Sequence, residues 1–94
     1  MRSNPNPRSL DAIAERLRAT REAFGLGQCE FPRRAGISGS DYKKYEQAKN
    51  LLKLDFANQI CDEYGVTLSW IYRGDVDGLP LHLANLLAKD QPSK

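Results

Sequence analysis

The sequence of 94 residues lacks any long run of apolar residues. A helix that crosses a membrane needs about 18 or more consecutive apolar residues, so we expect no membrane span. The N-terminal residues, Met-Arg-Ser-Asn-Pro-Asn-Pro-Arg, also lack the apolar core that a signal peptide requires. Both absences favour a cytoplasmic location.

Cysteine and histidine are scarce. Cys29 and Cys61 lie far apart, without the Cys-x-x-Cys spacing, and His82 is the only histidine. These residues cannot complete a tetrahedral zinc site within one chain. We expect the cysteines to be small buried apolar residues, with a redox or disulfide role as the alternative.

Catalytic motifs are missing as well. The sequence contains no Gly-rich phosphate loop, no nucleophile motif and no metal-ligand spacing. A domain of this length also has little room for a cleft. We therefore expect no enzymatic activity, no cofactor and no small-molecule ligand.

The composition is that of one globular domain, with 40% hydrophobic and 28% charged residues. Residues 1–50 carry ten Lys and Arg against six Asp and Glu, a net charge of +4, and residues 51–94 carry four against six, a net charge of −2. This asymmetry suggests one face for a polyanion, although ordinary scatter could also produce it.

Hydrophobic periodicity predicts a helical domain at 9–89, between an N-terminal arm (1–8) and a C-terminal tail (90–94), both flexible. Ser9 is a good N-cap for a first helix that ends at Gly25. Its apolar stripe is Leu10, Ile13, Leu17 and Phe24, and Arg16 and Arg18 are expected on a solvated face.

Two short helices follow, joined by a turn at Gly36. The first runs from about 28 to 35, with Gly27 as its N-cap, and the second begins at a capping box, Ser38-Gly39-Ser40-Asp41. In the second helix, Tyr42 and Tyr45 share one face. This layout is typical of a helix-turn-helix, whose second helix enters the DNA major groove.

The second half predicts three more helices after a connection at 48–53. One spans 54–64, and a short one runs from Thr67 to Gly74. The final helix spans 79–89, with Pro80 in its first turn and Leu79, Leu83, Leu86 and Leu87 on one stripe. No alternation long enough for a strand is present, so the fold class is all-α, a compact domain of five to six helices. The surplus of leucines in the final helix fits either a partner contact or packing onto the domain's own core.

Several fragments in fixed order resemble the Cro/cI-type (XRE) family of lambda-repressor-like helix-turn-helix regulators. They are Arg-x-x-Arg-Glu-x-x-Gly-Leu-x-Gln at 18–28, Gln-x-Glu-Phe-x-x-x-x-Gly-Ile-Ser at 28–38, Tyr-x-x-Tyr-Glu at 42–46 and Gly-Val-Thr-Leu-x-Trp-Ile-x-x-Gly at 65–74. The resemblance implies a five-helix domain, double-stranded DNA as partner, and a homodimer on a palindromic operator.

The resemblance also assigns roles to individual residues. Gln28 matches a glutamine that contacts a phosphate at a helix start, where free amide donors attract an anion. Arg21 and Glu46 match an ion pair, and Trp70 matches a core position. Lys53, Arg33 and Arg34 are weaker candidates for phosphate contacts. The predicted DNA-binding residues are Gln28, Ser38, Gly39, Ser40, Lys43, Lys44 and Lys49, with Lys44 and Ser40 best suited to read bases.

Four positions depart from the family pattern. Pro32 stands where the family usually has Ala, and it should distort the start of its helix. Ala48 replaces the usual Gly after the recognition helix, and Leu51-Leu52 replaces a more polar loop, which puts the path of 48–53 in question.

The function predicted from the sequence is sequence-specific DNA binding by a small transcriptional regulator. We expect a dimeric repressor from a phage or mobile element that blocks polymerase sterically. The alternative is a protein-interaction module on the same fold, such as an antitoxin or adaptor, which the acidic second half and the leucine-rich final helix favour.

Overall fold

A computed structural model describes residues 9–89, which form six α-helices and no strand. The predicted arm (1–8) and tail (90–94) lie outside the described residues. The helices are α1 (Leu10–Ala23), α2 (Glu30–Arg34), α3 (Gly39–Glu46), α4 (Leu54–Tyr64), α5 (Leu68–Arg73) and α6 (Leu81–Lys89). The all-α prediction is confirmed.

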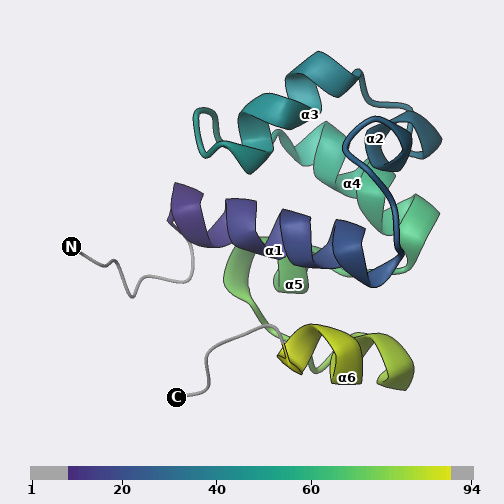
Figure 1. Cartoon of the computed structure of the whole chain (residues 1–94). Helices are drawn as coiled ribbons and strands as arrows, with labels where there is room; N and C mark the ends of the chain where they lie inside the picture. The colour runs from purple at the N-terminus through teal and green to yellow at the C-terminus, as the bar shows by residue number, and fades with distance from the viewer. Residues whose placement is uncertain (1–8, 90–94) are drawn as a thin grey trace.

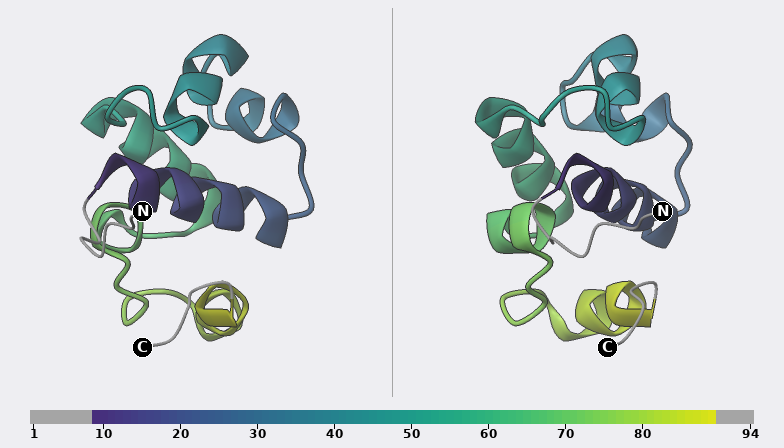
Figure 2. Two further views of the ribbon diagram at one scale, coloured as in Figure 1. Left: turned by 60° about the vertical axis from the view of Figure 1, so that its left-hand side comes forward. Right: turned by 90° about the vertical axis from the view of Figure 1, so that its left-hand side faces the viewer.

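Helix α1 lies in the middle of the molecule and contacts α3, α5 and α6 (Figure 1). Helices α2 and α3 lie on one side of α1, and α6 lies on the opposite side, as the turned views of Figure 2 also show. Helices α2 and α3 are therefore separated from α6 by the thickness of α1.

Aromatic side chains join helices α2 and α3 to the rest of the core. The rings of Phe31 and Tyr64 stack with centroids 4.2 Å apart, and Tyr42 packs on Phe31 at 5.4 Å. The Tyr64 hydroxyl donates to the Phe31 carbonyl at 2.6 Å. Trp70 is fully buried, as predicted, and its indole N–H donates to the Thr20 hydroxyl at 2.9 Å.

Helix starts follow the predicted caps at three places. The hydroxyls of Ser9, Ser38 and Thr67 accept hydrogen bonds from the backbone N–H three residues ahead. Each satisfies one of the donors that a helix start leaves unpaired. The start of α3 is thus fixed by Ser38, as the capping box predicted.

Three consecutive helix ends share one hydrogen-bond pattern. Helices α1, α2 and α3 each end in a Schellman motif, in which the backbone N–H of the second residue past the cap donates to a carbonyl five residues back. The residues that reverse the chain have positive φ: Gly25 (70°), Gly36 (79°) and Ala48 (60°). The Ala48 reversal is strained, because its Cβ disfavours left-handed backbone.

Helix α2 is shorter than the predicted span of 28–35, and Gly27 is not its cap. The Phe31 N–H donates to the Gly27 carbonyl and the Arg33 N–H to the Cys29 carbonyl. Between them, Pro32 has no N–H to give to the Gln28 carbonyl. The regular helix therefore begins at Glu30, with Cys29 at the cap position. The distortion predicted for Pro32 therefore takes the form of a delayed helix start.

Four side chains differ from their predicted burial. Arg16 was expected on a solvated face, but it is 3% exposed and its Nε donates to the Ile71 carbonyl at 3.0 Å. Leu10 and Leu86 were placed on apolar stripes but are 39% and 45% exposed. Cys29, expected to be buried, is exposed. The periodicity located the helices correctly, but it did not specify how wide each buried face is.

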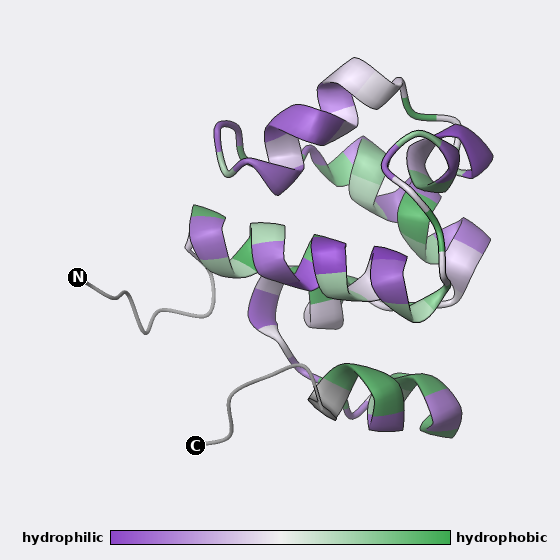
Figure 3. Cartoon of the chain, in the orientation of Figure 1, coloured by the Kyte–Doolittle hydropathy of each residue, from purple (hydrophilic) through white to green (hydrophobic). Residues whose placement is uncertain are grey.

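Leucines of α6 pack onto the core of the same chain. Leu83 and Leu87 of α6 are buried, as is Leu79 just before the helix, whereas Leu81 is 77% exposed. Figure 3 shows much of α6 in hydrophobic colours, in contrast to α3. None of the described helices is long and apolar enough to cross a membrane.

Candidate nucleic-acid interface

Helix α3 has one face buried and one face in solvent. Tyr42 is fully buried and Tyr45 is 5% exposed, as their predicted shared face requires. The opposite stripe consists of Ser40, Lys43, Lys44 and Gln47, all of which are exposed. This spacing of i, i+3, i+4 and i+7 puts all four side chains on one side of the helix.

An open groove of about 560 Å³ lies along this exposed stripe. It is lined by Gln28, Cys29, Gly39, Ser40, Lys43, Lys44, Gln47 and Lys49. Six of the seven predicted DNA-binding residues therefore come together in one place. Among these lining residues, three are lysines and none is Asp or Glu, so the groove has the charge that a phosphate backbone attracts.

Ser38 is the predicted site residue that does not line the groove. Its hydroxyl caps α3 by accepting from the Asp41 N–H at 3.1 Å, and it lies 3.4 Å from the Ser40 hydroxyl. Next to it, a Cβ added at Gly39 would meet nothing within 4 Å. The start of α3 thus presents small groups and open space, which allow the backbone to approach a large ligand closely.

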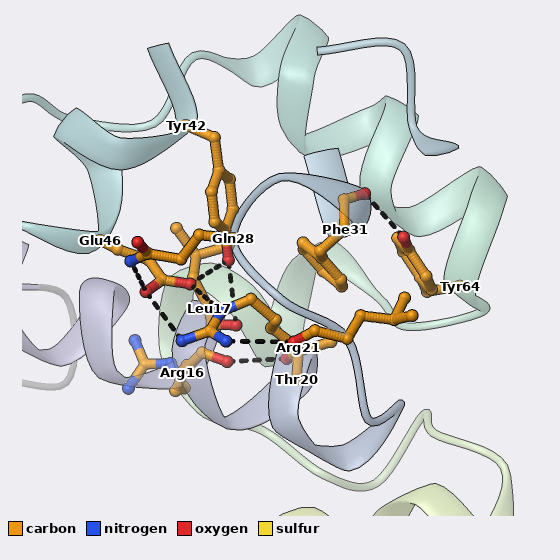
Figure 4. A network of polar contacts seen from close by, with 10 residues as sticks. Arg16, Leu17, Thr20, Arg21, Gln28, Phe31, Tyr42, Glu46 and Tyr64 are labelled. Atoms are coloured by element: carbon orange, nitrogen blue, oxygen red, sulfur yellow. Dashed lines mark hydrogen bonds and ion pairs between the residues drawn. The ribbon is translucent and has the colours of Figure 1, made fainter. Parts of the chain in front are cut away.

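A buried polar network, which shares Gln28 with the groove, joins α1 to α3 (Figure 4). Glu46 is the last residue of α3. Its carboxylate accepts hydrogen bonds from Arg21 Nε at 2.7 Å and from Arg21 Nη2 at 3.3 Å. The Tyr42 hydroxyl donates to the same carboxylate. Arg21 Nη1 also donates to the Leu26 carbonyl at 3.1 Å. The ion pair expected between Arg21 and Glu46 is confirmed, and it joins α1 to the end of α3.

Burial and hydrogen bonding act in opposite directions on Glu46. Burial alone would raise the pKa of the carboxyl, but hydrogen bonds from Arg21, Tyr42 and Gln28 together outweigh it and lower the pKa below its ordinary value. Burial and the bond to Glu46 both raise the pKa of the Tyr42 hydroxyl. The network therefore holds a carboxylate and a neutral phenol near neutral pH.

Gln28 belongs to both the network and the groove. Its side-chain Nε2 donates to Glu46 Oε1 at 2.9 Å, while the half-buried side chain also lines the groove. An amide nitrogen carries two N–H donors and the amide oxygen accepts, so one donor and the oxygen remain for a ligand. The predicted phosphate contact is compatible with this geometry, because Glu46 holds the carboxamide at the groove wall.

The weaker phosphate candidates lie outside the groove. Arg33 and Arg34 form ion pairs with Glu30 on the exposed side of α2. Lys53 lies over the Phe56 ring at 6.0 Å from its centroid. These three side chains therefore already interact with neighbouring residues of the chain.

Two lining residues, Cys29 and Gln47, were missed by the sequence analysis. Gln47 could have been found, because it extends the exposed stripe of Lys43 and Lys44 by one helical turn. Glutamine can pair with adenine through two hydrogen bonds. Cys29 carries no comparable signal, since a free cysteine is more often buried than exposed.

The geometry defines a helix-turn-helix unit: α2 and α3 joined at Gly36, with the outer face of α3 exposed and basic. Comparison with family models agrees, since the helix-turn-helix domain model matches residues 14–75. The chain belongs to this family of helix-turn-helix domains, which points to DNA binding and transcription regulation. No curated protein and no solved structure gives a significant match.

Proposed function

We propose that this chain is a sequence-specific, double-stranded DNA-binding repressor that acts as a dimer on a palindromic operator. The observation that supports it best is the groove along α3, where Lys43, Lys44 and Lys49 gather without an acidic residue among the lining side chains. A major groove admits one α-helix, and the exposed face of α3 is polar and carries Lys43 and Lys44.

Roles within the interface follow from side-chain chemistry. Lys44 and Ser40 read base edges, and Gln47 extends the reading stripe toward the next base pair. Lys43, Lys49 and Gln28 contact phosphates, which position the protein without reading sequence. Two copies on adjacent half-sites place their α3 helices about 34 Å apart. A dimer bound over a promoter would block polymerase, as a small repressor of a phage or mobile element does.

Selection from random duplex DNA tests the proposal. We expect enriched sequences with a palindrome and a half-site spacing of about one helical turn. Affinity for a selected duplex should fall steeply with salt, because each neutralised phosphate releases counterions. Recovery of no enriched sequence, together with binding that is insensitive to salt, would refute the proposal.

Two lysine variants and one control separate base recognition from the general electrostatic contribution to DNA affinity. Lys43→Ala should weaken binding to all sequences alike and reduce the slope of log affinity against log salt concentration by about one phosphate contact. Lys44→Ala should in addition relax the base preference at one position. The matched control is Arg73→Ala, which removes an equal charge from an exposed residue of α5. If all three variants lose affinity equally, the groove is not the binding site.

A second candidate function is a protein-interaction module, such as an antitoxin or adaptor. Leu81 and Leu86 of α6 are 77% and 45% exposed, which favours it, because a partner protein could cover exposed leucines. The same DNA selection discriminates the two functions: enrichment of a palindrome supports the repressor. A complex with a partner protein that forms equally well with Lys43→Ala, in the absence of any DNA binding, supports the module.

A further inference from the structure

The Glu46 carboxylate lies at the centre of the polar network, and each of its oxygens accepts two hydrogen bonds. Glu46 Oε2 accepts from Arg21 Nε at 2.7 Å and from the Tyr42 hydroxyl. Glu46 Oε1 accepts from Arg21 Nη2 at 3.3 Å and from Gln28 Nε2 at 2.9 Å (Figure 4). A carboxylate has about four acceptor sites, so these donors use its capacity and hold it in one orientation.

The network reaches the groove through one of its donors. Of Arg21, Tyr42 and Gln28, only Gln28 is among the residues that line the groove. The Glu46 side chain is 2% exposed, whereas Gln28 is half-buried. Glu46 is therefore too buried to contact a large ligand itself, and Gln28 links the carboxylate to the groove.

The carboxylate also determines which end of the Gln28 amide turns inward. An ionised carboxylate accepts hydrogen bonds and donates none. The Gln28 amide must therefore present its NH₂ group to Glu46, because the amide oxygen would be repelled. The terminal torsion of a glutamine is broad and roughly two-fold, so a glutamine in solvent samples both orientations of its amide. Glu46 thus selects one of the two orientations before any ligand binds.

This selection matters to a phosphate, whose oxygens accept hydrogen bonds and repel an amide oxygen. Glu46 holds one N–H of Gln28 Nε2, and the second N–H of the same atom remains for a ligand. Ordering a flexible side chain at an interface lowers affinity by roughly two- to tenfold. Since Gln28 is already ordered in the free chain, this loss is avoided when DNA binds.

We propose that Glu46 is a positioning residue for DNA binding, which orients the Gln28 amide so that the second N–H of Nε2 donates to a DNA phosphate. This inference rests on the proposed DNA-binding function. It adds a residue that determines affinity without touching DNA, and it names the atom through which that residue acts. Because a phosphate contact reads no base, Glu46 affects the affinity for all sequences alike.

The test is a double-mutant cycle on one duplex recovered by the DNA selection. Gln28→Met removes the amide but keeps the length of the side chain, and Glu46→Gln removes the charge but keeps the shape. Gln28→Met alone should weaken DNA binding roughly tenfold. In the Glu46→Gln background the same change should weaken binding only about twofold, because the amide is no longer held in the productive orientation.

The cycle separates positioning from two other effects of Glu46→Gln. This variant leaves the Arg21 charge without its carboxylate, and the added positive charge by itself attracts DNA. That attraction is the same with and without Gln28→Met, so it cancels in the cycle. A shift of α3 would likewise lower affinity in both backgrounds. A purely structural role of Glu46 therefore produces no coupling between the two positions.

Tyr42→Phe is the matched control, because it removes a different donor from the same carboxylate and keeps the aromatic ring. Gln28 retains its hydrogen bond to Glu46 in this variant. We therefore expect Gln28→Met to weaken binding by the full factor of roughly ten in the Tyr42→Phe background. All affinities are measured at a temperature at which a thermal melt shows every variant to be folded.

A second measurement locates the phosphate. Each phosphate of the duplex is replaced in turn by an uncharged methylphosphonate. At one position in each half-site, Gln28→Met should then cause no further loss of affinity, because its contact has already been removed. Gln28→Met should also leave the slope of log affinity against log salt concentration unchanged, since a neutral amide releases no counterion.

Three results would overturn the inference. They are equal losses from Gln28→Met with and without Glu46→Gln, a loss in the Tyr42→Phe background as small as in the Glu46→Gln background, and no phosphate whose replacement abolishes the effect of Gln28→Met. The first would show that Glu46 only stabilises the fold. Failure of the proposed function itself looks different, because the selection would then enrich no duplex at all.

Discussion

Two arginines of α1 tie opposite sides of the molecule to the same helix. Arg21 donates to the Glu46 carboxylate at the end of α3, next to the groove. Arg16 donates to the Ile71 carbonyl in α5, where the Thr20 hydroxyl joins the Arg16 carbonyl to the Trp70 indole. Both side chains hold a neighbouring helix against α1.

The contacts of Arg21 and Arg16 differ in the group that accepts the hydrogen bond. On the recognition side the acceptor is an ionised side chain, so one substitution or a low pH can remove it. On the α5 side the acceptor is main chain, which no substitution removes and no pH neutralises. The recognition helix is therefore held by the more adjustable of the two contacts, and the following predictions test that difference.

Removing the Glu46 side chain should have the largest effect. Glu46→Ala leaves a mostly buried Arg21 without this carboxylate and should reduce the free energy of unfolding by about 3–5 kcal/mol, as measured by urea denaturation. Glu46→Gln keeps an acceptor of the same shape and should lose less. A loss below about 1 kcal/mol in Glu46→Ala would place this contact among weak surface pairs.

Acid should affect the recognition side through the same carboxylate, with a smaller effect because only a proton is added. The pKa of Glu46 is lowered from 4.5 in the folded chain. Its contribution to stability is therefore fully present above the unfolded pKa and is lost as pH falls through the lowered folded pKa. Urea titrations from pH 6 downward should show a steeper loss for the unmodified chain than for Glu46→Gln, and equal slopes would contradict this.

The end of α5 offers a test of the Arg16 side. Gly74 has φ of 78°, and a Cβ there would lie 3.1 Å from Arg16 Nη1. Gly74→Ala should cost about 2 kcal/mol of unfolding free energy, partly from left-handed backbone and partly from displacing the guanidinium.

A glycine in open space provides the control for Gly74. At Gly25, φ is 70° and an added Cβ would meet nothing within 4 Å. Gly25→Ala should therefore cost only the backbone part, about 1 kcal/mol. Equal losses in the two variants would mean that Arg16 moves aside without cost.

The end of α3 should give the smallest effect, with the opposite sign. Ala48 has φ of 60°, so Ala48→Gly relieves left-handed strain while adding freedom to the unfolded chain. We expect a gain of about 0.5 kcal/mol in unfolding free energy by thermal denaturation, with DNA affinity unchanged. A loss of stability would show that the alanine methyl packs usefully against its surroundings.

The contacts of Arg21 and Arg16 also differ in whether they could be predicted from the sequence. The ion pair between Arg21 and Glu46 was predictable, because opposite charges stand at positions that match a family pattern. The contact between Arg16 and Ile71 was not, since a backbone carbonyl is present at every residue and leaves no mark in the sequence. Arg16 was therefore placed in solvent, where an arginine is usually found.

The candidate interface shows a similar division. Helical spacing was enough to gather Ser40, Lys43 and Lys44 on one face of α3. The inward hydrogen bond of Gln28 could not be predicted, because it depends on where the end of α3 meets the turn before α2 in space. Leu52 is buried whereas the neighbouring Leu51 is exposed. This difference likewise depends on a distant part of the chain, because the Tyr72 hydroxyl donates to the Leu52 carbonyl.

The three chain reversals at Gly25, Gly36 and Ala48 have an evolutionary consequence. They set the directions of the first three helices through backbone hydrogen bonds, and the outward side chains of α3 take no part in them. Lys43, Lys44 and Gln47 can therefore be exchanged with little penalty to folding. Under the proposed function, a lineage built on this scaffold could change the DNA sequence that it recognises by a few substitutions, while the backbone that positions α3 stays constant.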